Sequence, residues 1–357
     1  MAVADLTVRL LSWPPIRACK QSMNPDGPWM DVFRNAVRHE RRRLLKLPLL
    51  GALAAALPAS AKAEDMGTPP TVRPMPLVDA RFPAEMAPGI FIVPDRRIPL
   101  VPNIGIIVGR DAVLVIDCGL GLENTDGVSK LARQLAPGRQ VLLTITHTHP
   151  EHGSGAQVFK PDARILYNRD QRDYLLRTGA NQIDAFRHGF LPSDQAHLLD
   201  GIVITPPDET YEGSKTIDLG GRKVEFRTRG TAHSPGDQII ILPEEKIVFA
   251  GDLIEERMFP IIPFFPPMVT QADIDVERWE SILIEMRALK PRFIVPGHGN
   301  LGGPEIIDDV LNYFKDLKLL AHNRSADELR NAIRAKYPTW ENDQFISPAV
   351  QYFLKRS

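Results

Sequence analysis

The stretch from His147 to Gly153 constrains this chain more than any other part of its sequence. It places three imidazoles, those of His147, His149 and His152, and the carboxylate of Glu151 within six residues. An apolar run over residues 141–145 comes directly before it and predicts a buried strand. Neutral imidazole and carboxylate suit zinc and similar divalent metals, and a turn can aim His147 and His149 at one ion while Glu151 and His152 face another. The spacing therefore predicts a site for two metal ions at the end of this strand.

Three later segments repeat the placement of a ligand-type side chain at a predicted strand end. His233 lies in a Gly- and Pro-containing loop, Asp252 follows an apolar run, and His298 follows another such run through a Pro-Gly pair. Loops at strand ends commonly carry functional side chains. Five of the nine histidines occupy such positions. For His188 and His197, which lie in a looser span before His233, a surface or core role is the favoured interpretation.

The first 63 residues predict an export signal rather than part of the fold. An arginine pair, Arg41 and Arg42, precedes an uncharged run over residues 47–60, and the small-x-small triplet ending at Ala63 follows it. The run is short for a membrane-spanning helix, and the arginine pair is typical of twin-arginine signals. We therefore expect a periplasmic protein cleaved near Ala63, with translation starting at Met1 or Met30. A basic amphipathic surface helix is the alternative.

Charge and cysteine content argue against two other classes of protein. Residues 1–63 hold 10 of the 43 basic and 4 of the 44 acidic residues, which leaves 33 against 40 and a net charge of −7 in the exported part. That balance argues against a nucleic-acid partner, because such binding depends on clustered Lys and Arg. Cys19 lies in the predicted signal, so Cys118 is alone in the exported part and has no disulfide partner there. It follows a buried-strand pattern, so we interpret it as a buried hydrophobe rather than a nucleophile.

The remaining pattern predicts an α+β domain over residues 89–303, preceded at 64–88 by a linker or extended arm rich in Pro, Ala and Met. Apolar runs at 90–93, 104–108 and 113–116 predict an antiparallel meander. A Gly-Gly pair between the runs 217–219 and 223–227 predicts a hairpin. Further elements are expected as a strand at 164–167 and helices at 129–135, 169–177, from Pro304 onward, and at 326–335 with Ser325 as N-cap. We expect the C-terminal helices, residues 304–357, to pack on the same domain.

The order of the ligand candidates resembles the metallo-β-lactamase superfamily. The chain has His-x-His-x-Glu-His at 147–152, then His233, Asp252 and His298, and the strand end at Asp117 is similar to the first motif of that family. The resemblance covers about residues 85–300. It implies a four-layer αβ/βα sandwich, in which two mixed sheets are flanked by helices and the metals lie at one edge. It also implies that His147, His149 and His233 bind one metal, that Glu151, His152 and His298 bind the second, and that Asp252 bridges them. The family usually has Asp where this chain has Glu151.

The resemblance implies a metallo-hydrolase, and two zinc ions are the expected cofactor, with iron as the alternative metal. Two dications about 4 Å apart lower the pKa of a bridging water, hold it as hydroxide and polarise the scissile group, so no serine or cysteine nucleophile is required. Asp252 or Glu151 would orient the hydroxide and pass its proton to the leaving group. Asp117 would fix an imidazole tautomer, and a turn-capping role is its alternative. The expected substrate is a small molecule with an ester, thioester, lactone or amide bond.

Other functions stay open on the sequence. A single iron held by His147, His233 and Asp252 would fit an oxidative enzyme similar to the superfamily's persulfide dioxygenases. A non-catalytic metal-binding module of a periplasmic redox assembly is the third interpretation. β-Lactamase activity is less favoured, because Asp252 replaces the cysteine of one lactamase branch.

A proline-rich apolar stretch, residues 258–268, follows Asp252. Its four prolines exclude a regular helix or a central strand. We expect this stretch to form an apolar wall over the site through Phe259, Ile262, Phe264 and Phe265. Contact with a membrane or with a second copy of the chain is the alternative, and the sequence does not specify the oligomeric state.

Overall fold

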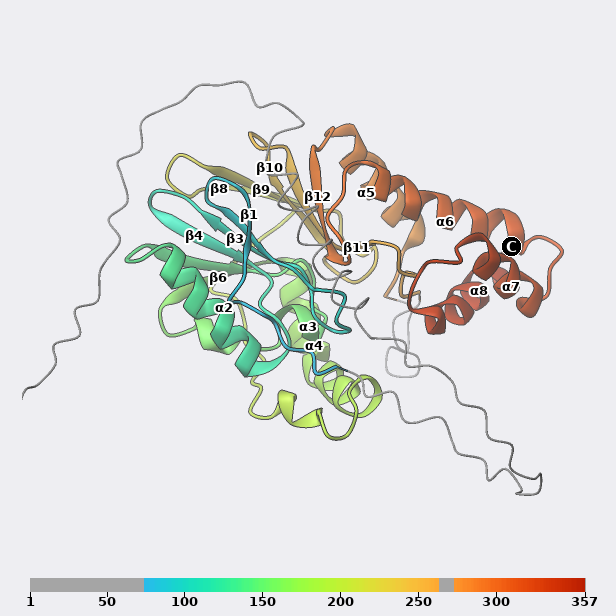
Figure 1. Ribbon diagram of the computed structural model, residues 1–357, viewed down its shortest axis with the longest axis horizontal. Helices are drawn as coiled ribbons and strands as arrows, with labels where there is room; N and C mark the ends of the chain where they lie inside the picture. The colour runs from blue at the N-terminus through green and yellow to red at the C-terminus, as the bar shows by residue number, and fades with distance from the viewer. Residues whose placement is uncertain (1–73, 263–272, 357) are drawn as a thin grey trace, which may run out of the picture. The chain divides into compact units, whose positions relative to one another are not determined.

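The computed structural model describes residues 74–262 and 273–356, whose strands form two mixed sheets (Figure 1). Within these residues the first sheet has seven strands, in the order β1 (Ala84–Ala87), β2 (Ile90–Val93), β3 (Ile104–Val108), β4 (Ala112–Ile116), β5 (Gln140–Thr144), β6 (Ala163–Asn168) and β7 (Glu209–Tyr211). The second has five, in the order β12 (Phe293–His298), β11 (Ile247–Glu255), β10 (Gln238–Leu242), β9 (Lys223–Thr228) and β8 (Ser214–Asp218).

The strand directions confirm two local predictions. Strands β2, β3 and β4 pair antiparallel as the predicted meander, and β8 and β9 pair antiparallel as the predicted hairpin. Strands β4 to β7 run parallel, so the carboxyl ends of β4, β5 and β6 meet at one edge of the first sheet. In the second sheet β11 and β12 are parallel, and their carboxyl ends also lie together.

The helices between β4 and β7 in the sequence lie beside the first sheet, and the helices after β11 lie beside the second sheet (Figure 1). The first set comprises α2 (Gly121–Leu135), α3 (Pro150–Gly153), the 3-10 turn η1 (Ala156–Phe159), α4 (Arg169–Ala185), the π-helical turn η2 (Phe186–Phe190) and the 3-10 turn η3 (Ala196–Leu199). The second set comprises α5 (Val276–Ala288), α6 (Glu305–Ala321), α7 (Ala326–Lys336), the 3-10 turn η4 (Asp343–Phe345) and α8 (Ile346–Leu354). No helix of the described ranges combines the length and hydropathy needed to cross a bilayer.

Central strands of both sheets, such as β4 and β10, are buried on both faces, which explains why they are continuous apolar runs in the sequence. In β4, Leu114 packs in the core between the two sheets, whereas Val115 packs in the core under α2. In β10, Ile240 faces the first sheet and Ile241 faces the helices on the opposite side. Successive side chains of a strand point to opposite faces, so each strand contributes to two cores. The result is the four-layer α+β sandwich that the sequence predicted.

The C-terminal helices share one apolar core with the outer face of the second sheet. Trp279 of α5, Phe314 of α6 and Phe353 of α8 are buried in a cluster that also contains Val248 of β11. The Trp279 and Phe314 rings pack edge to face with centroids 5.1 Å apart. Ser325 forms the predicted N-cap of α7, with a capping box to Glu328. Residues 304–357 belong to the same compact unit as the two sheets.

Several elements differ from the prediction. Residues 84–87, expected in the linker, form β1 at the edge of the first sheet. Helix α2 begins at Gly121 rather than at the predicted Ser129. The prediction missed its first turns because they bury polar residues such as Thr125, which a hydrophobic pattern does not detect. The Thr125 hydroxyl donates to Gly121 O (2.8 Å). Strand β10 and helices α5 and α8 were not predicted. The predicted export signal, residues 64–73 of the linker and the segment 263–272 lie outside the described residues.

Cys118 provides a test of this packing. It is fully buried in the core of the first sheet, and burial raises the pKa of its thiol to about 12. The thiolate is the reactive form, so we expect Cys118 to resist Ellman's reagent in the folded protein at mildly alkaline pH. In a Cys19→Ser chain, the measurement should give no reactive thiol in buffer and one per chain in guanidinium chloride. Fast labelling in buffer would contradict the buried, inert role.

Candidate metal centre

The predicted ligand side chains converge at one edge of the sandwich. His147 and His149 follow β5, Glu151 and His152 lie on the short helix α3, His233 follows β9, Asp252 lies on β11 and His298 ends β12. All seven residues are buried. Two groups of four have ligand atoms that all lie within 4.8 Å of one another: His147, His149, His233 and Asp252 in the first group, and Glu151, His152, Asp252 and His298 in the second. The structure thus brings together all seven residues, in the two sets that the resemblance implied.

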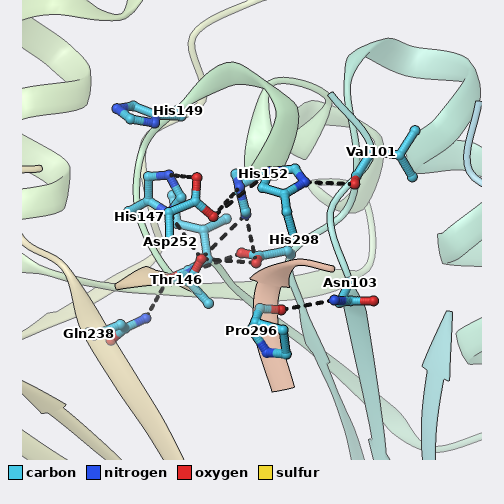
Figure 2. Close-up of polar contacts among 12 residues, drawn as sticks. Val101, Asn103, Thr146, His147, His149, His152, Gln238, Asp252, Pro296 and His298 are labelled. Atoms are coloured by element: carbon cyan, nitrogen blue, oxygen red, sulfur yellow. Dashed lines mark hydrogen bonds and ion pairs between the residues drawn. The ribbon is translucent and has the colours of Figure 1, made fainter. Parts of the chain in front are cut away.

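Asp252 is shared by the two groups, and each of its oxygens faces one of them. Its Oδ2 lies 3.6 Å from His147 Nε2 and 3.8 Å from His233 Nε2. Its Oδ1 lies 3.3 Å from His152 Nε2 and 3.8 Å from His298 Nε2. Figure 2 shows the carboxylate between His147 on one side and His152 and His298 on the other. This is the arrangement that a carboxylate bridging two ions requires.

The donor atoms fit divalent metals. His147 Nε2, His152 Nε2, Glu151 Oε2 and both oxygens of Asp252 are buried, and within the described residues they have no hydrogen-bond partner. Buried polar atoms nearly always have a partner, so a concentration of unsatisfied nitrogens and carboxylate oxygens at one place indicates a group that the protein itself does not supply. Imidazole and carboxylate ligands suit zinc. The residues present therefore fit two metal ions.

Burial and mutual repulsion set the protonation of the first group. Burial lowers the pKa of His147 and of His149 well below the usual value, with neighbouring imidazoles adding to the effect, and it lowers the pKa of His233 to about 4. Burial would raise the pKa of Asp252, but the imidazoles of His152, His298 and His147 outweigh it and hold that pKa well below its usual value. Neutral imidazole and ionised carboxylate are the forms that bind metals.

Asp117 holds the imidazole of His152 from the side opposite the metals. His152 Nδ1 donates to Asp117 Oδ2 (2.9 Å), so in the neutral imidazole the lone pair is on Nε2, which faces Asp252. The same carboxylate accepts from the backbone N–H of Thr146 (2.7 Å) and from its hydroxyl (2.9 Å). Asp117 thus lies where it can fix the tautomer of His152, and its side chain bonds the loop after β5 and His152 rather than its own turn. Its left-handed backbone (φ 64°) is one that Asp tolerates better than most residues.

His298 is held in the same manner by Val101 and Asn103, in the loop before β3, which no sequence motif marks. Its Nδ1 donates to the carbonyl of Val101 (2.9 Å). Two residues later, Asn103 Nδ2 donates to Pro296 O (3.0 Å) and Gly299 O (2.9 Å), on either side of His298, while its Oδ1 accepts from Asp95 N (3.0 Å). Figure 2 shows the hydrogen bonds from His298 to Val101 and from Asn103 to Pro296. No local pattern marks Asn103, because the carbonyls it binds lie 193 and 196 residues away in the chain.

The backbone around the ligands is also fixed by side-chain amides and by close packing. Gln171 Nε2 donates to the carbonyls of Ile145 and Thr146 (both 3.0 Å), just before His147. Gly297 lies so close to Asp252 that a Cβ atom there would overlap its carboxylate, so only glycine allows β12 to approach β11 at this point. His188 and His197 are exposed and lie outside both ligand groups, as the favoured interpretation expected.

A cavity of about 120 Å³ lies beside the second group. Glu151 and His298 line it, whereas none of the three histidines of the first group does. Glu255, at the end of β11, also lines the cavity. The sequence predicted that this strand ends at Asp252, but the apolar pair 253–254 continues the strand to Glu255. The walls are mainly apolar and include Ile98, Leu100, Phe186, Leu191, Met258 and Ile261.

Of the four residues predicted to form the apolar wall, the two that the structure describes do not line the cavity. Phe259 and Ile262 are fully buried in the core under the C-terminal helices, where the Phe259 ring packs 5.5 Å from that of Trp340. Their neighbours Met258 and Ile261 line the cavity instead. Neighbouring residues of an irregular segment point to different sides, which composition alone does not resolve. Phe264 and Phe265 lie outside the described residues.

Asn103 provides a test of how His298 is held. We expect Asn103→Ala to weaken binding of the second zinc ion by about 10- to 100-fold, because the support of a ligand typically has that effect, while the first ion binds as before. Isothermal titration calorimetry of the metal-free protein measures both steps. Asn124→Ala is the matched control, since Asn124 also makes three hydrogen bonds to backbone groups, between α2 and the N-terminal arm. Equal losses in the two variants would show a general effect on stability.

Glu151 provides a second test, because its side chain is one methylene longer than the aspartate usual in the resembled family. We expect the two zinc ions to bind in distinct steps, with the weaker ion in the group that contains Glu151. Glu151→Asp should tighten that weaker step. Two equally tight sites that Glu151→Asp leaves unchanged would show that the longer side chain is fully accommodated.

Comparison with known proteins agrees with this geometry. Residues 97–298 match the family model described as the metallo-beta-lactamase superfamily. The chain is 30% identical over 104 residues to a type 2 metallo-beta-lactamase of Bacteroides fragilis, a match that covers 29% of this chain and only 39% of that protein. It is 26% identical over 243 residues to acyl-coenzyme A thioesterase MBLAC2 of Gallus gallus, which covers 64% of this chain and 83% of that protein.

The fold also matches that of a solved relative. A metallo-beta-lactamase family protein of Thermus thermophilus superimposes with a TM-score of 0.54 at 17% identity, over 76% of this chain and 95% of that protein. At this identity the likeness concerns the fold alone. The family match over residues 97–298 shows that the chain belongs to the metallo-beta-lactamase superfamily, and the likeness in fold agrees with it.

Proposed function

We propose that this protein is a dinuclear zinc hydrolase that cleaves the acyl bond of a small molecule, with thioesters as the first substrate class and esters, lactones and amides as the related ones. The observation that carries the proposal is the shared carboxylate of Asp252, which has a complete ligand group on each of its oxygens. The match to an acyl-coenzyme A thioesterase over most of that relative's length supports the choice of thioesters.

The position of each residue in the metal centre indicates its role in the reaction. Two ions held by these residues would supply a lowered pKa of the attacking water and polarisation of the scissile carbonyl. Asp252 supplies the negative charge between the two groups but does not line the cavity, whereas Glu151 lies in the second group and does line it. We therefore assign proton transfer between water and leaving group to the Glu151 carboxylate, through the oxygen that an ion in the second group would leave free. Asp117 and the Val101 carbonyl keep the Nδ1 protons of His152 and His298 on the side away from the substrate.

The test is hydrolysis by protein stripped of metal and reloaded with zinc, on matched panels of thioesters, esters, lactones, amides and β-lactams. We expect zinc-dependent cleavage, fastest with a thioester. His149→Ala should lower kcat/KM by about 100-fold or more, because it removes a ligand rather than a ligand's support. Circular dichroism should show an unchanged fold. Full turnover in His149→Ala, or in metal-free protein, would refute the site assignment.

We further propose that the protein is exported to the periplasm by a twin-arginine signal. Arg41 and Arg42 precede an uncharged run and a small-x-small triplet, which supports this proposal. We expect replacement of both arginines by lysine to leave the precursor in the cytoplasm, as measured by cell fractionation. N-terminal sequencing of the exported wild-type protein should begin at Glu64. Unchanged export of the double variant would contradict the twin-arginine assignment.

A further inference from the structure

We propose that the cavity beside the second ligand group binds the acyl part of the substrate and selects uncharged acyl groups over those that carry a carboxylate. The proposal rests on the proposed hydrolase function and adds the chemical class of the acyl group. It follows from the position of the cavity, from the ion pairs of Arg97 on its wall and from the acidic groups that remain.

The position of the cavity makes it the site of the acyl group. Glu151 and His298, which belong to the second ligand group, line it together with apolar side chains such as Leu100, Phe186 and Ile261. Its volume of about 120 Å³ is close to that of a protein cavity, of about 150 Å³, that binds benzene. A chain of about six carbon atoms attached to a carbonyl at the second group is of this size.

Arg97 is the one arginine or lysine among the described residues that line the cavity, and it already forms ion pairs. Arg97 Nη1 donates to Glu256 (2.9 Å), and Arg97 Nε donates to Glu341 (2.9 Å). Its Nη2 donates to the carbonyl of Glu256 (3.3 Å). A substrate carboxylate would have to break one of these pairs to gain a charged partner, so Arg97 as it stands gives an anion little advantage.

The carboxyl groups on the wall offer an anion no positive charge either. Asp95 accepts hydrogen bonds from the backbone N–H groups of Gly299 (2.7 Å) and Arg97 (3.1 Å). Glu255 is 3% exposed, its Oε2 has no hydrogen-bond partner among the described residues, and it belongs to neither ligand group. An anionic acyl group would thus leave water for a cavity whose walls offer carboxyl groups and hydrocarbon. An uncharged acyl chain meets no such cost.

The experiment compares two thioesters of N-acetylcysteamine that differ only at the end of the acyl chain, hexanoyl with a methyl group and adipoyl with a carboxylate. With the zinc-loaded full chain we expect kcat/KM to favour the hexanoyl thioester by about 10-fold or more. Equal kcat/KM values, or a preference for the adipoyl thioester, would overturn the proposal.

Glu341→Gln tests the role of Arg97 directly. Glu341 is half exposed, so the change is compatible with folding, and it replaces the ion pair with Arg97 by a hydrogen bond to a neutral amide, which a substrate carboxylate displaces more easily. A hydrogen bond to a charged group then becomes accessible to the adipoyl carboxylate, so the ratio of kcat/KM, hexanoyl over adipoyl, should fall by about 10-fold. Glu244→Gln is the matched control: it removes the same charge from an exposed turn before the opposite end of β11 and should leave the ratio unchanged.

Binding measurements separate this proposal from the proposed function. If no thioester is hydrolysed with any metal, the hydrolase proposal fails, and calorimetric binding of the same two thioesters still tests the cavity. Tighter binding of the hexanoyl compound in the wild type, with a smaller difference in Glu341→Gln, would support the selectivity. A ratio that Glu341→Gln leaves unchanged, or that Glu244→Gln lowers equally, would overturn the role given to the Arg97 ion pairs.

Discussion

The buried carboxylate of Asp252 is the interaction on which the rest of the site depends. An isolated ionised carboxylate has a high free-energy cost in a protein interior and must be compensated by polar or positively charged partners. Here four imidazole nitrogens, two from each ligand group, lie within 3.8 Å of its oxygens. They come from the loop after β5, α3, the loop after β9 and β12, so the compensation exists only when both sheets are formed and packed. Metal binding at such a site is therefore coupled to folding of the whole sandwich.

The outer nitrogens of the imidazoles explain much of the surrounding polar network. A histidine binds a metal through one nitrogen, and the hydrogen bond at the other sets its tautomer and ring orientation. His152 uses the Asp117 carboxylate for this purpose, and His298 uses the Val101 carbonyl. The two partners flank the open end of the β3–β4 hairpin, since Val101 comes just before β3, Asp117 comes just after β4, and the two strands pair antiparallel. The meander at the start of the domain thus positions ligands that it does not itself contain.

The site is asymmetric because the cavity meets the second ligand group and not the histidines of the first. Its wall combines the loop before β3, the π-helical turn η2 after α4, the residues after β11 and the segment that holds η4. The C-terminal region, expected from the sequence only as packing helices, therefore also contributes to the surroundings of the site through Glu341 and Phe345. The Arg97 ion pairs join this segment to the loop before β3 and to the residue after β11.

The sequence by itself determined the parts of this protein that depend on local pattern. Runs such as 113–116 and 247–250 identified strands buried on both faces, and the cluster at 147–152, with its later partners, identified the ligands, because residue type and order are written in the chain. Only the tertiary structure decided which oxygen of Asp252 faces which ligand group, and that Asn103 binds the backbone on either side of His298. It also decided that Glu255 lines the cavity, and that Ile261 rather than Phe259 forms the cavity wall. These features depend on contacts between residues far apart in the chain and on the direction of side chains in irregular segments. Neither has a local periodicity, so no pattern in the sequence specifies them.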